Sequence, residues 1–296
     1  MNRSRRRAYA SQGVLAFGAL AALLLAAPGD RGAAPRGLLA ALSAAPAGGA
    51  RAAAATRWLV GAKYRRDPLG EGAGPDPEPR FRLDAFDCQT FVETAIALGS
   101  SRTLAEAARA LDDIRYEGTP SLPARHHEMQ AQWIPANLAR GWIAEATREI
   151  ADERVVLLAR TFTAASWTEV HRAGRAVWGL PRDREPLGRF ETWAVLPEDL
   201  EAVAPRIPEG AVVLVLREDR VDRPTRVSHV GLVVIGPEGE RLVRHATSTR
   251  GVERVIEEPL SRFIAREARA YPSWPVAGFA IYAIPDSSLR VEALSR

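Results

Sequence analysis

The chain contains one cysteine, Cys88, and a cysteine thiolate can attack an amide carbonyl. Such a reaction also needs a base that takes and returns the thiol proton, and donors that stabilise the tetrahedral oxyanion. Asp87 precedes apolar residues at helical spacing, which predicts a helix that begins at Cys88 with Asp87 as its N-cap. Unpaired N–H groups and the helix dipole favour a thiolate there. The alternative is that Cys88 is a small buried apolar residue.

Two histidines of the second half of the chain are candidates for the base. His229 lies in the apolar run 227–235 and His245 in the run 241–247, with turn residues between them. The pattern predicts a hairpin whose paired residue numbers sum to about 476, which makes His245 the diagonal neighbour of His229 on one sheet face. We therefore expect His229 to be the base and His245 to orient its ring. A slip of one residue would separate them, and a satisfied core histidine is the plainer interpretation of His229.

The elements that must position these residues change in type along the chain. Helices are predicted over 88–100, 103–113, 127–140 and 166–178, with Pro135 kinking or splitting the third. Strands are predicted over 211–217, 227–235, 241–247 and 276–284, with a helix over 260–270 before the last strand. Helices followed by a run of antiparallel strands favour an α+β fold.

The N-terminal 27 residues are typical of an export signal. Arginines precede an apolar run, 14–27, that is shorter than the roughly 20 residues needed to span a bilayer. A signal peptide is the first interpretation and an uncleaved N-terminal anchor the second. The Ala-, Gly- and Pro-rich segment 28–56 is predicted to be a poorly ordered linker. The folded domain is expected over 57–286, followed by a C-terminal tail over 287–296.

The net charge of +4 comes from the N-terminal segment. Residues 1–50 hold six arginines and one aspartate, whereas the remaining residues hold 34 basic and 35 acidic side chains. The body of the protein is therefore nearly neutral, and its net charge gives no support for a nucleic-acid partner. Membrane contact is expected only through the N-terminal signal or anchor.

Several motifs resemble the NlpC-type cell-wall cysteine hydrolases, and in particular their N-acetylmuramoyl-L-alanine amidase-like branch. They are VGAKYRRDPLGEG, FRLDAFDCQTFVET, RHHEMQAQWIPANLARG, VSHVGLVV, RHATS and WPVAGFAIYAI, which together span about residues 58–285. The resemblance implies a papain-like fold in which a nucleophilic cysteine at a helix start packs against an antiparallel sheet. It also implies cleavage of the amide between muramic acid lactate and the first L-alanine of the peptidoglycan stem.

The resemblance assigns roles to four residues of this chain. By position, Cys88 is the nucleophile, His229 the base and His245 the orienting third residue. Tyr64 matches the tyrosine that precedes the cysteine in the superfamily, where it assists the oxyanion. A long segment, GEGAGPDPEPR, lengthens the gap between Tyr64 and Cys88 beyond the usual spacing.

Further residues could line a substrate groove. Arg125 could face a stem carboxylate, with His126 and Trp133 beside it, although Trp133 could instead pack a helix and leave Arg125 in solvent. The run His126-His127-Glu128 lacks a zinc-binding spacing, so no metal is expected. His171 is expected at the surface, and the seven tryptophans are expected mainly in the core.

The sequence therefore predicts an exported cysteine amidase that acts on peptidoglycan or muropeptides in the periplasm or outside the cell, without a cofactor. A γ-D-glutamyl-diamino acid endopeptidase would use the same residues with a different groove. A catalytically silent wall-binding module is the alternative from another class, and an acyltransferase is a third. The bond cleaved decides between the two hydrolases.

Overall fold

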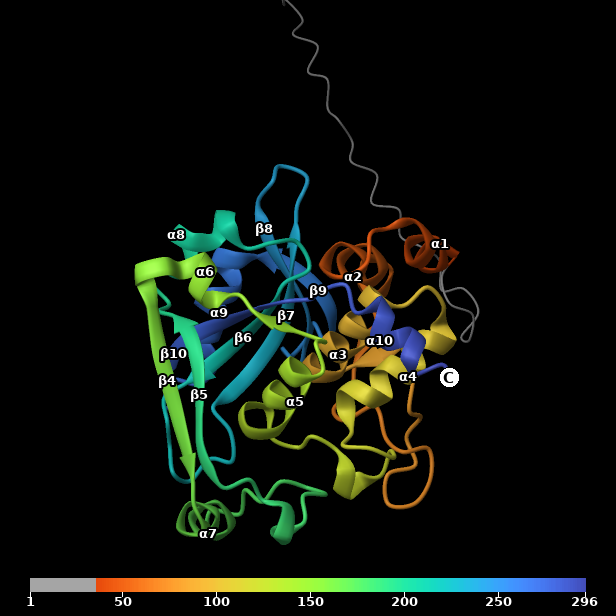
Figure 1. Cartoon of the computed structure of the whole chain (residues 1–296). Helices are drawn as coiled ribbons and strands as arrows, with labels where there is room; N and C mark the ends of the chain where they lie inside the picture. The colour runs from red at the N-terminus through yellow and green to blue at the C-terminus, as the bar shows by residue number, and fades with distance from the viewer. Residues whose placement is uncertain (1–35) are drawn as a thin grey trace, which may run out of the picture. The chain divides into compact units, whose positions relative to one another are not determined.

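The computed structural model describes residues 36–296, and the predicted export signal lies outside the described residues. Within residues 36–296 no helix has the length and apolar character needed to cross a membrane. The helices and strands are drawn in Figure 1. The helices are α1 (Arg36–Ala44), α2 (Gly49–Thr56), α3 (Cys88–Ser100), α4 (Leu104–Arg115), α5 (Ile134–Ala139), α6 (Thr147–Ala151), α7 (Ala164–Arg172), α8 (Leu200–Val203), α9 (Leu260–Ala270) and α10 (Ser288–Ala293).

The described strands form one mixed, mostly antiparallel sheet in the order β2-β1-β9-β8-β7-β6-β10-β5-β4, with β3 paired to β10. The β1–β2 pair is parallel and the other pairs are antiparallel. The strands are β1 (Lys63–Tyr64), β2 (Ala85–Phe86), β3 (Ala144–Glu145), β4 (Val155–Phe162), β5 (Gly188–Val195), β6 (Val212–Arg217), β7 (Val227–Ile235), β8 (Arg241–Thr247), β9 (Arg254–Pro259) and β10 (Val276–Ala283).

The two faces of the sheet carry different helices. Figure 1 shows α1 to α4 and α10 gathered on one side, whereas α6, α8 and α9 lie toward the other. The main core joins α3 to the face that carries Val230 and Leu232, and a second core joins Phe263 of α9 to the face that carries Val233 and Val243. Alternation along β7 accounts for this division, because successive strand residues point to opposite faces.

The predicted α+β class is confirmed, and so are several element boundaries. β7, β8 and α9 have the predicted limits, and α3 begins at Cys88 as predicted. The helix predicted over 127–140 is split, as Pro135 predicts, into a π-helix, Met129–Trp133, and α5. The helix predicted over 166–178 is shorter, because α7 ends at Arg172.

The predicted linker is wrong over residues 36–56, which form α1 and α2 and bury Leu38 and Leu42. Small residues make this packing possible. A Cβ at Gly99 of α3 would come within 3.1 Å of the Ala52 Cβ and 2.9 Å of the Gly48 carbonyl oxygen, so only glycine admits so close an approach.

The predicted C-terminal tail is also wrong, because its residues form α10 and close the molecule. Val291 is buried, and the Arg290 guanidinium binds the Asp113 carboxylate at the end of α4, with an Nε–Oδ2 distance of 2.6 Å. The folded domain therefore extends at both ends beyond the predicted limits of 57–286.

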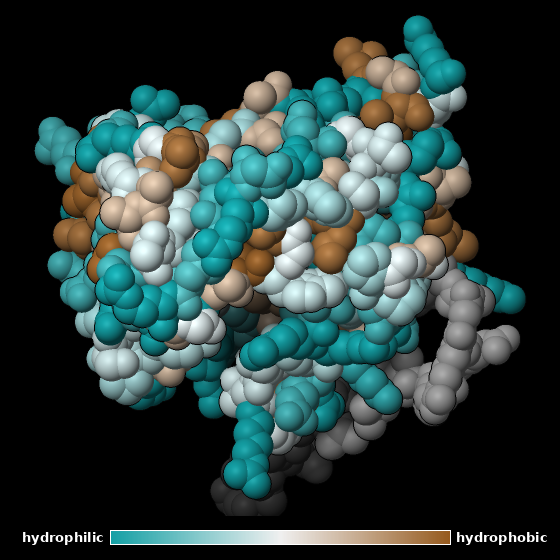
Figure 2. Space-filling view, turned by 90° about the horizontal axis from the view of Figure 1, so that it is seen from below, coloured by the Kyte–Doolittle hydropathy of each residue, from teal (hydrophilic) through white to brown (hydrophobic). Residues whose placement is uncertain are grey.

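The face seen in Figure 2 is mainly hydrophilic, with apolar residues in separate small patches. Large continuous apolar areas are typical of protein or membrane contact. This face therefore gives no sign of a broad apolar docking surface.

Candidate active site

Cys88 occupies the first position of α3, and the residue before it fixes the helix start. Asp87 Oδ1 accepts a hydrogen bond from the Thr90 backbone N–H at 2.8 Å, and Thr90 Oγ1 accepts one from the Asp87 N–H at 3.0 Å. This reciprocal cap confirms the prediction for Asp87 and holds the first turn in place.

The Cys88 thiol is only partly accessible, and its environment keeps it protonated. Burial raises the pKa of Cys88 to about 12, and the negative charge of Asp87 adds to this, although the backbone N–H groups of Val230 and Gln89 hydrogen-bond to the sulfur and oppose the shift. The helix start favours the thiolate as expected, through the Gln89 N–H, but burial outweighs this effect. The thiol needs a base before it can act as a nucleophile.

The predicted hairpin register is confirmed, and it brings His229 and His245 together. The paired residues Leu232 and Arg244 sum to 476, as do the three following pairs. His229 Nε2 lies 2.9 Å from His245 Nδ1, and the two rings meet edge to face with centroids 4.9 Å apart. A Cβ at Gly231 would lie 2.6 Å from Val243 Cγ1 and 3.3 Å from the His245 Cβ, so this glycine permits the close packing of β7 on β8.

Both imidazoles are kept neutral by their surroundings. Burial lowers the pKa of His229 well below its ordinary value, and the neighbouring His245, Arg266 and Arg217 add to the effect. Burial also lowers the pKa of His245, although Glu258 opposes the shift. A neutral imidazole has one N–H and one lone pair, so each ring can both donate and accept a hydrogen bond.

The Cys88 thiol approaches β7 at the backbone next to His229. Its hydrogen bond from the backbone comes from Val230, the residue that follows His229. The His229 ring itself packs toward α9, with its centroid 5.8 Å from that of Phe263. Among residues 36–296 no hydrogen bond joins the thiol directly to either imidazole. In unliganded enzymes such contacts are often long and tighten when substrate binds.

Tyr64 lies beside Cys88 although the two are far apart in sequence. β1 pairs with β2 so that Tyr64 is opposite Phe86, which precedes the cysteine by two residues. Burial raises the pKa of Tyr64, and the nearby Cys88 and Asp87 add to the shift, whereas a hydrogen bond with the Ser248 hydroxyl lowers it. The two ends of the long segment between Tyr64 and Cys88 therefore lie side by side in the β1–β2 pair.

A pocket of about 230 Å³ opens beside the nucleophile. Its walls come from the start of α3, the end of α4, the long segment after Tyr64, the chain before the π-helix and the turn after α7. The lining residues are Asp67, Asp87, Gln89, Thr90, Arg115, Arg125, His126, His127, Val177 and Trp178. Asp87 and Gln89, on both sides of Cys88 in the chain, line this pocket, although Cys88 itself does not.

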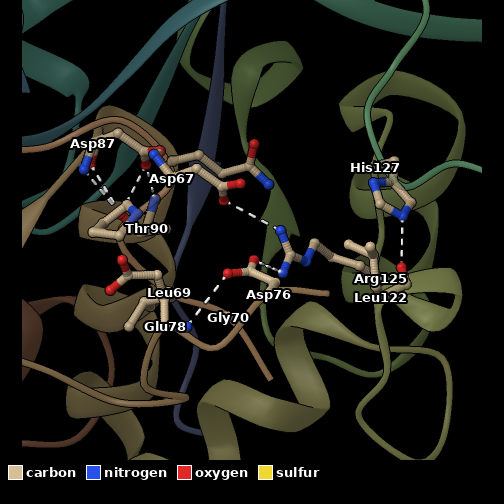
Figure 3. Close-up of polar contacts among 12 residues, drawn as sticks. Asp67, Leu69, Gly70, Asp76, Glu78, Asp87, Thr90, Leu122, Arg125 and His127 are labelled. Carbon is tan, nitrogen blue, oxygen red and sulfur yellow. Dashed lines mark hydrogen bonds and ion pairs between the residues drawn. The ribbon is translucent and has the colours of Figure 1, made fainter. Parts of the chain in front are cut away.

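Arg125 lines the pocket but is already bound to carboxylates, as Figure 3 shows. Its guanidinium lies 2.7 Å from Glu71 Oε1, 2.7 Å from Asp76 Oδ2 and 3.2 Å from Asp67 Oδ1. These acids belong to the long segment after Tyr64, which Arg125 therefore holds against the body of the protein. Because its Nη1 and Nη2 atoms are bound to these acids, the expected role of facing a substrate carboxylate does not fit Arg125.

The other predicted groove residues have separate environments. His126 is buried at the pocket wall, where burial and the charge of Arg140 lower its pKa to about 4. Trp133 is fully buried in the core and does not reach the pocket. His171 is half-buried and pairs with Glu185, with an Nε2–Oε1 distance of 2.6 Å.

Two residues near the site carried no recognisable sequence signal. Glu258 Oε1 lies 3.0 Å from His245 Nε2, and Trp178 is 55% exposed at the pocket with the Arg125 guanidinium 5.8 Å from its ring centre. Most other tryptophans are buried, as expected. Within the described part of the chain, no group of three or more His, Cys, Asp or Glu side chains could hold a metal ion.

Residues 54–270 match the family described as "AmiA-like: N-acetylmuramoyl-L-alanine amidase-like". The chain belongs to this AmiA-like family. The family region contains Cys88, both histidines and Glu258, and it ends with α9. A search of curated proteins found no match.

Solved structures share the fold of the AmiA-like chain at low sequence identity. A Legionella pneumophila protein of the DUF1460 family is 22% identical, with a TM-score of 0.64 over 78% of this chain and 87% of its own. An N-acetylmuramoyl-L-alanine amidase from Bacteroides uniformis is 18% identical, with a TM-score of 0.57 over 84% of this chain and 98% of its own. A putative xylanase from Bacteroides fragilis is 19% identical, with a TM-score of 0.57 over 75% of this chain and 96% of its own.

Proposed function

We propose that this AmiA-like chain is a cysteine amidase that hydrolyses the bond between N-acetylmuramic acid and L-alanine in peptidoglycan or muropeptides. Three observations carry the proposal: the Cys88 thiol next to the Val230 backbone, the hydrogen bond between His229 and His245, and a pocket lined by the residues that flank Cys88. The family match and the likeness to the Bacteroides uniformis amidase support this choice of substrate. We also propose that the arrangement is papain-like.

The reaction follows from the protonation states of the three groups. His229 Nδ1 takes the thiol proton as Sγ attacks the lactyl carbonyl carbon, and the carbonyl π electrons move to oxygen. The C–N bond then breaks, and the departing L-alanine nitrogen takes the proton from His229. Water attacks the thioester with His229 as base, which releases the carboxylic acid and returns the proton to the sulfur.

The oxyanion needs donors near Cys88. The Cys88 backbone N–H lies at the start of a helix, where it has no partner within the helix, and the Tyr64 hydroxyl lies close to the thiol. We propose that both face the developing oxyanion. No cofactor takes part in any step.

The proposed place of action is outside the cytoplasm, with the N-terminal 27 residues as signal peptide or anchor. This part of the proposal rests on the arginines and the apolar run of the sequence. A peptidoglycan substrate agrees with it, because that polymer lies outside the cytoplasmic membrane.

The test is digestion of defined muropeptides by the full chain, followed by mass spectrometry. The amidase releases the intact stem peptide and leaves the glycan with a free lactyl carboxylate, whereas an endopeptidase would cut within the stem. Cys88→Ala should lose the activity by several orders of magnitude while its thermal unfolding stays cooperative. Equal product from wild type and Cys88→Ala would rule out Cys88 as the nucleophile, and no product from either would favour a silent binding module.

A further inference from the structure

The hydrogen-bond geometry assigns Glu258 as the residue that positions the two histidines by fixing which ring nitrogens carry protons. This inference rests on the proposed function, since it concerns how His229 is held as a base. Glu258 does not touch the thiol or the pocket; it acts through His245. It is therefore a positioning residue.

Glu258, His245 and His229 form a chain of hydrogen bonds, and the carboxylate at its end permits only one placement of the ring protons. Glu258 Oε1 lies 3.0 Å from His245 Nε2, and an ionised carboxylate can only accept, so the proton lies on His245 Nε2. His245 Nδ1 then has a lone pair and accepts from His229 Nε2, 2.9 Å away. The proton of the neutral His229 ring is therefore on Nε2, and Nδ1 keeps the lone pair that a base needs.

Arg266 could in principle reverse this order, because its Nη2 lies 3.3 Å from His245 Nε2. A donation from Arg266 would require a lone pair on His245 Nε2 and would set that lone pair against the Glu258 oxygen. The shorter contact of Arg266 is to Glu258 itself, with Nε 2.8 Å from Oε1. Arg266 therefore keeps Glu258 ionised, and the hydrogen bonds from His245 and Arg266 lower the pKa of Glu258 against the effect of burial.

Glu258 is also one member of a closed ring of polar contacts. Arg266 Nη1 lies 2.8 Å from Glu267 Oε1, and Glu267 Oε2 lies 2.8 Å from Arg217 Nη2. Arg217 Nε donates to the hydroxyl of Ser228 at 2.7 Å, and Ser228 precedes His229. These contacts therefore connect the side chain of His245 to Ser228, the residue next to His229, and so close the ring.

The ring is placed where it can resist rearrangement. His245 and Arg217 are fully buried, and Glu258 and Glu267 are nearly so. Two of the ring's charged side chains come from α9, which packs Phe263 against both imidazoles. Since water has little access, a change of proton order would leave buried donors or acceptors without partners, which is costly.

Glu258→Gln tests the assignment with little change in shape. The amide either keeps its oxygen toward His245 as a weaker acceptor or turns its NH2 group there, which reverses both tautomers. We expect a fall of about 10- to 100-fold in kcat with little change in KM, because a wrong tautomer removes the base without removing the binding site. Glu258→Asp, which keeps the charge, should recover part of the loss.

The matched control is Glu257→Gln, on the same strand. Glu257 points away from the histidines and binds Arg244, with an Oε1–Nη2 distance of 2.5 Å. This variant should keep the wild-type kcat. Equal rates in the two glutamine variants, or a loss below about threefold in Glu258→Gln, would overturn the assignment. An inactive wild type would instead count against the proposed function.

A second measurement does not depend on activity or on the fold of any Glu258 variant. Two-bond proton–nitrogen spectra of the wild-type chain, labelled with nitrogen-15 at its 5 histidines, report the tautomer of each ring. Assignment uses the signals lost in His229→Asn and His245→Asn. We expect His229 and His245 both to carry the proton on Nε2. A proton on Nδ1 of His245 would overturn the inference even if the enzyme is active.

Discussion

The two sides of Cys88 differ in how many of their buried polar atoms have hydrogen-bond partners. On the histidine side, the members of the ring from Ser228 to Glu267 have partners for their buried side-chain nitrogen and oxygen atoms. On the pocket side, several buried atoms have none: Glu71 Oε2, Arg115 Nε, Arg125 Nε and Glu128 Oε1. A fully bonded network fixes one geometry, whereas unsatisfied groups leave a region adaptable.

This difference suggests that the two sides of Cys88 have different roles, one in holding the reacting groups and the other in binding substrate. The reacting groups require a single proton order, and the closed ring of hydrogen bonds makes the histidine side rigid. The pocket side has to receive a substrate and release two products, and its walls come from five separate segments of the chain. The predictions below alter one side at a time.

The largest effect is expected from His229→Ala, which removes the base and breaks the ring. Since the thiol has a raised pKa, the remaining enzyme cannot form a thiolate at neutral pH, and kcat should fall by about 10³-fold or more. Muropeptide hydrolysis measures the change. The control is His171→Ala on the distant helix α7, which should retain wild-type turnover; comparable losses in both variants would contradict the role of His229.

The histidine side was more predictable from sequence than the pocket side, for a physical reason. A hairpin with one buried face has its register fixed by alternation and by the turn, so His229 and His245 could be paired from the sequence alone. The last helix before the closing strand was equally clear, because its apolar residues recur at helical spacing.

The pocket side depends on contacts that no local pattern carries. Arg125 meets acids about 50 residues earlier in the chain, so its partners could not be inferred, and the direction of Trp133 into the core was mistaken for a groove position. The error over 36–56 has another cause. Alanine and glycine permit the close approach of α2 to α3, yet they give little of the apolar contrast that identifies a helix.

Arg125→Met is expected to have the largest effect on stability. It leaves Glu71 and Asp76 buried without their cation, which should lower the free energy of unfolding by about 3–5 kcal/mol. Urea denaturation measures the loss. Arg80→Met is the matched control on the same segment, because the Arg80–Asp112 pair is exposed at Arg80 and should contribute no more than about 1 kcal/mol. Similar losses would show that Arg125 is not the anchor of this segment.

Glu128, the N-cap of the π-helix, should make stability depend on pH. Burial raises the pKa of Glu128 to about 7 from an ordinary value of 4.5, with hydrogen bonds from Ala131 and Thr225 opposing the shift. Between these values the folded state holds a proton that the unfolded state releases, so stability should fall as pH rises from about 4.5 to about 7. The fall should be on the order of 2–3 kcal/mol.

Glu128→Gln should remove that dependence and make the protein relatively more stable above pH 7. Denaturation midpoints measured from pH 5 to pH 8 test this, with exposed Glu149→Gln as a control that should keep the wild-type slope. The same slope in Glu128→Gln and wild type would show that Glu128 is not the titrating group.

The smallest effect is expected from Trp178→Ala, which changes the pocket side without disturbing folding. Trp178 is 55% exposed and lines the pocket beside Val177, so its ring offers an apolar face to a bound sugar or peptide group. We expect KM to rise by about 3- to 10-fold with kcat unchanged, since a platform of this kind binds substrate and transition state alike. Trp58→Ala is the matched control, because Trp58 is 51% exposed and does not line this pocket. A fall in kcat at constant KM in Trp178→Ala would show instead that the pocket wall helps to position the reacting groups, and the division between a rigid side and an adaptable side would not hold.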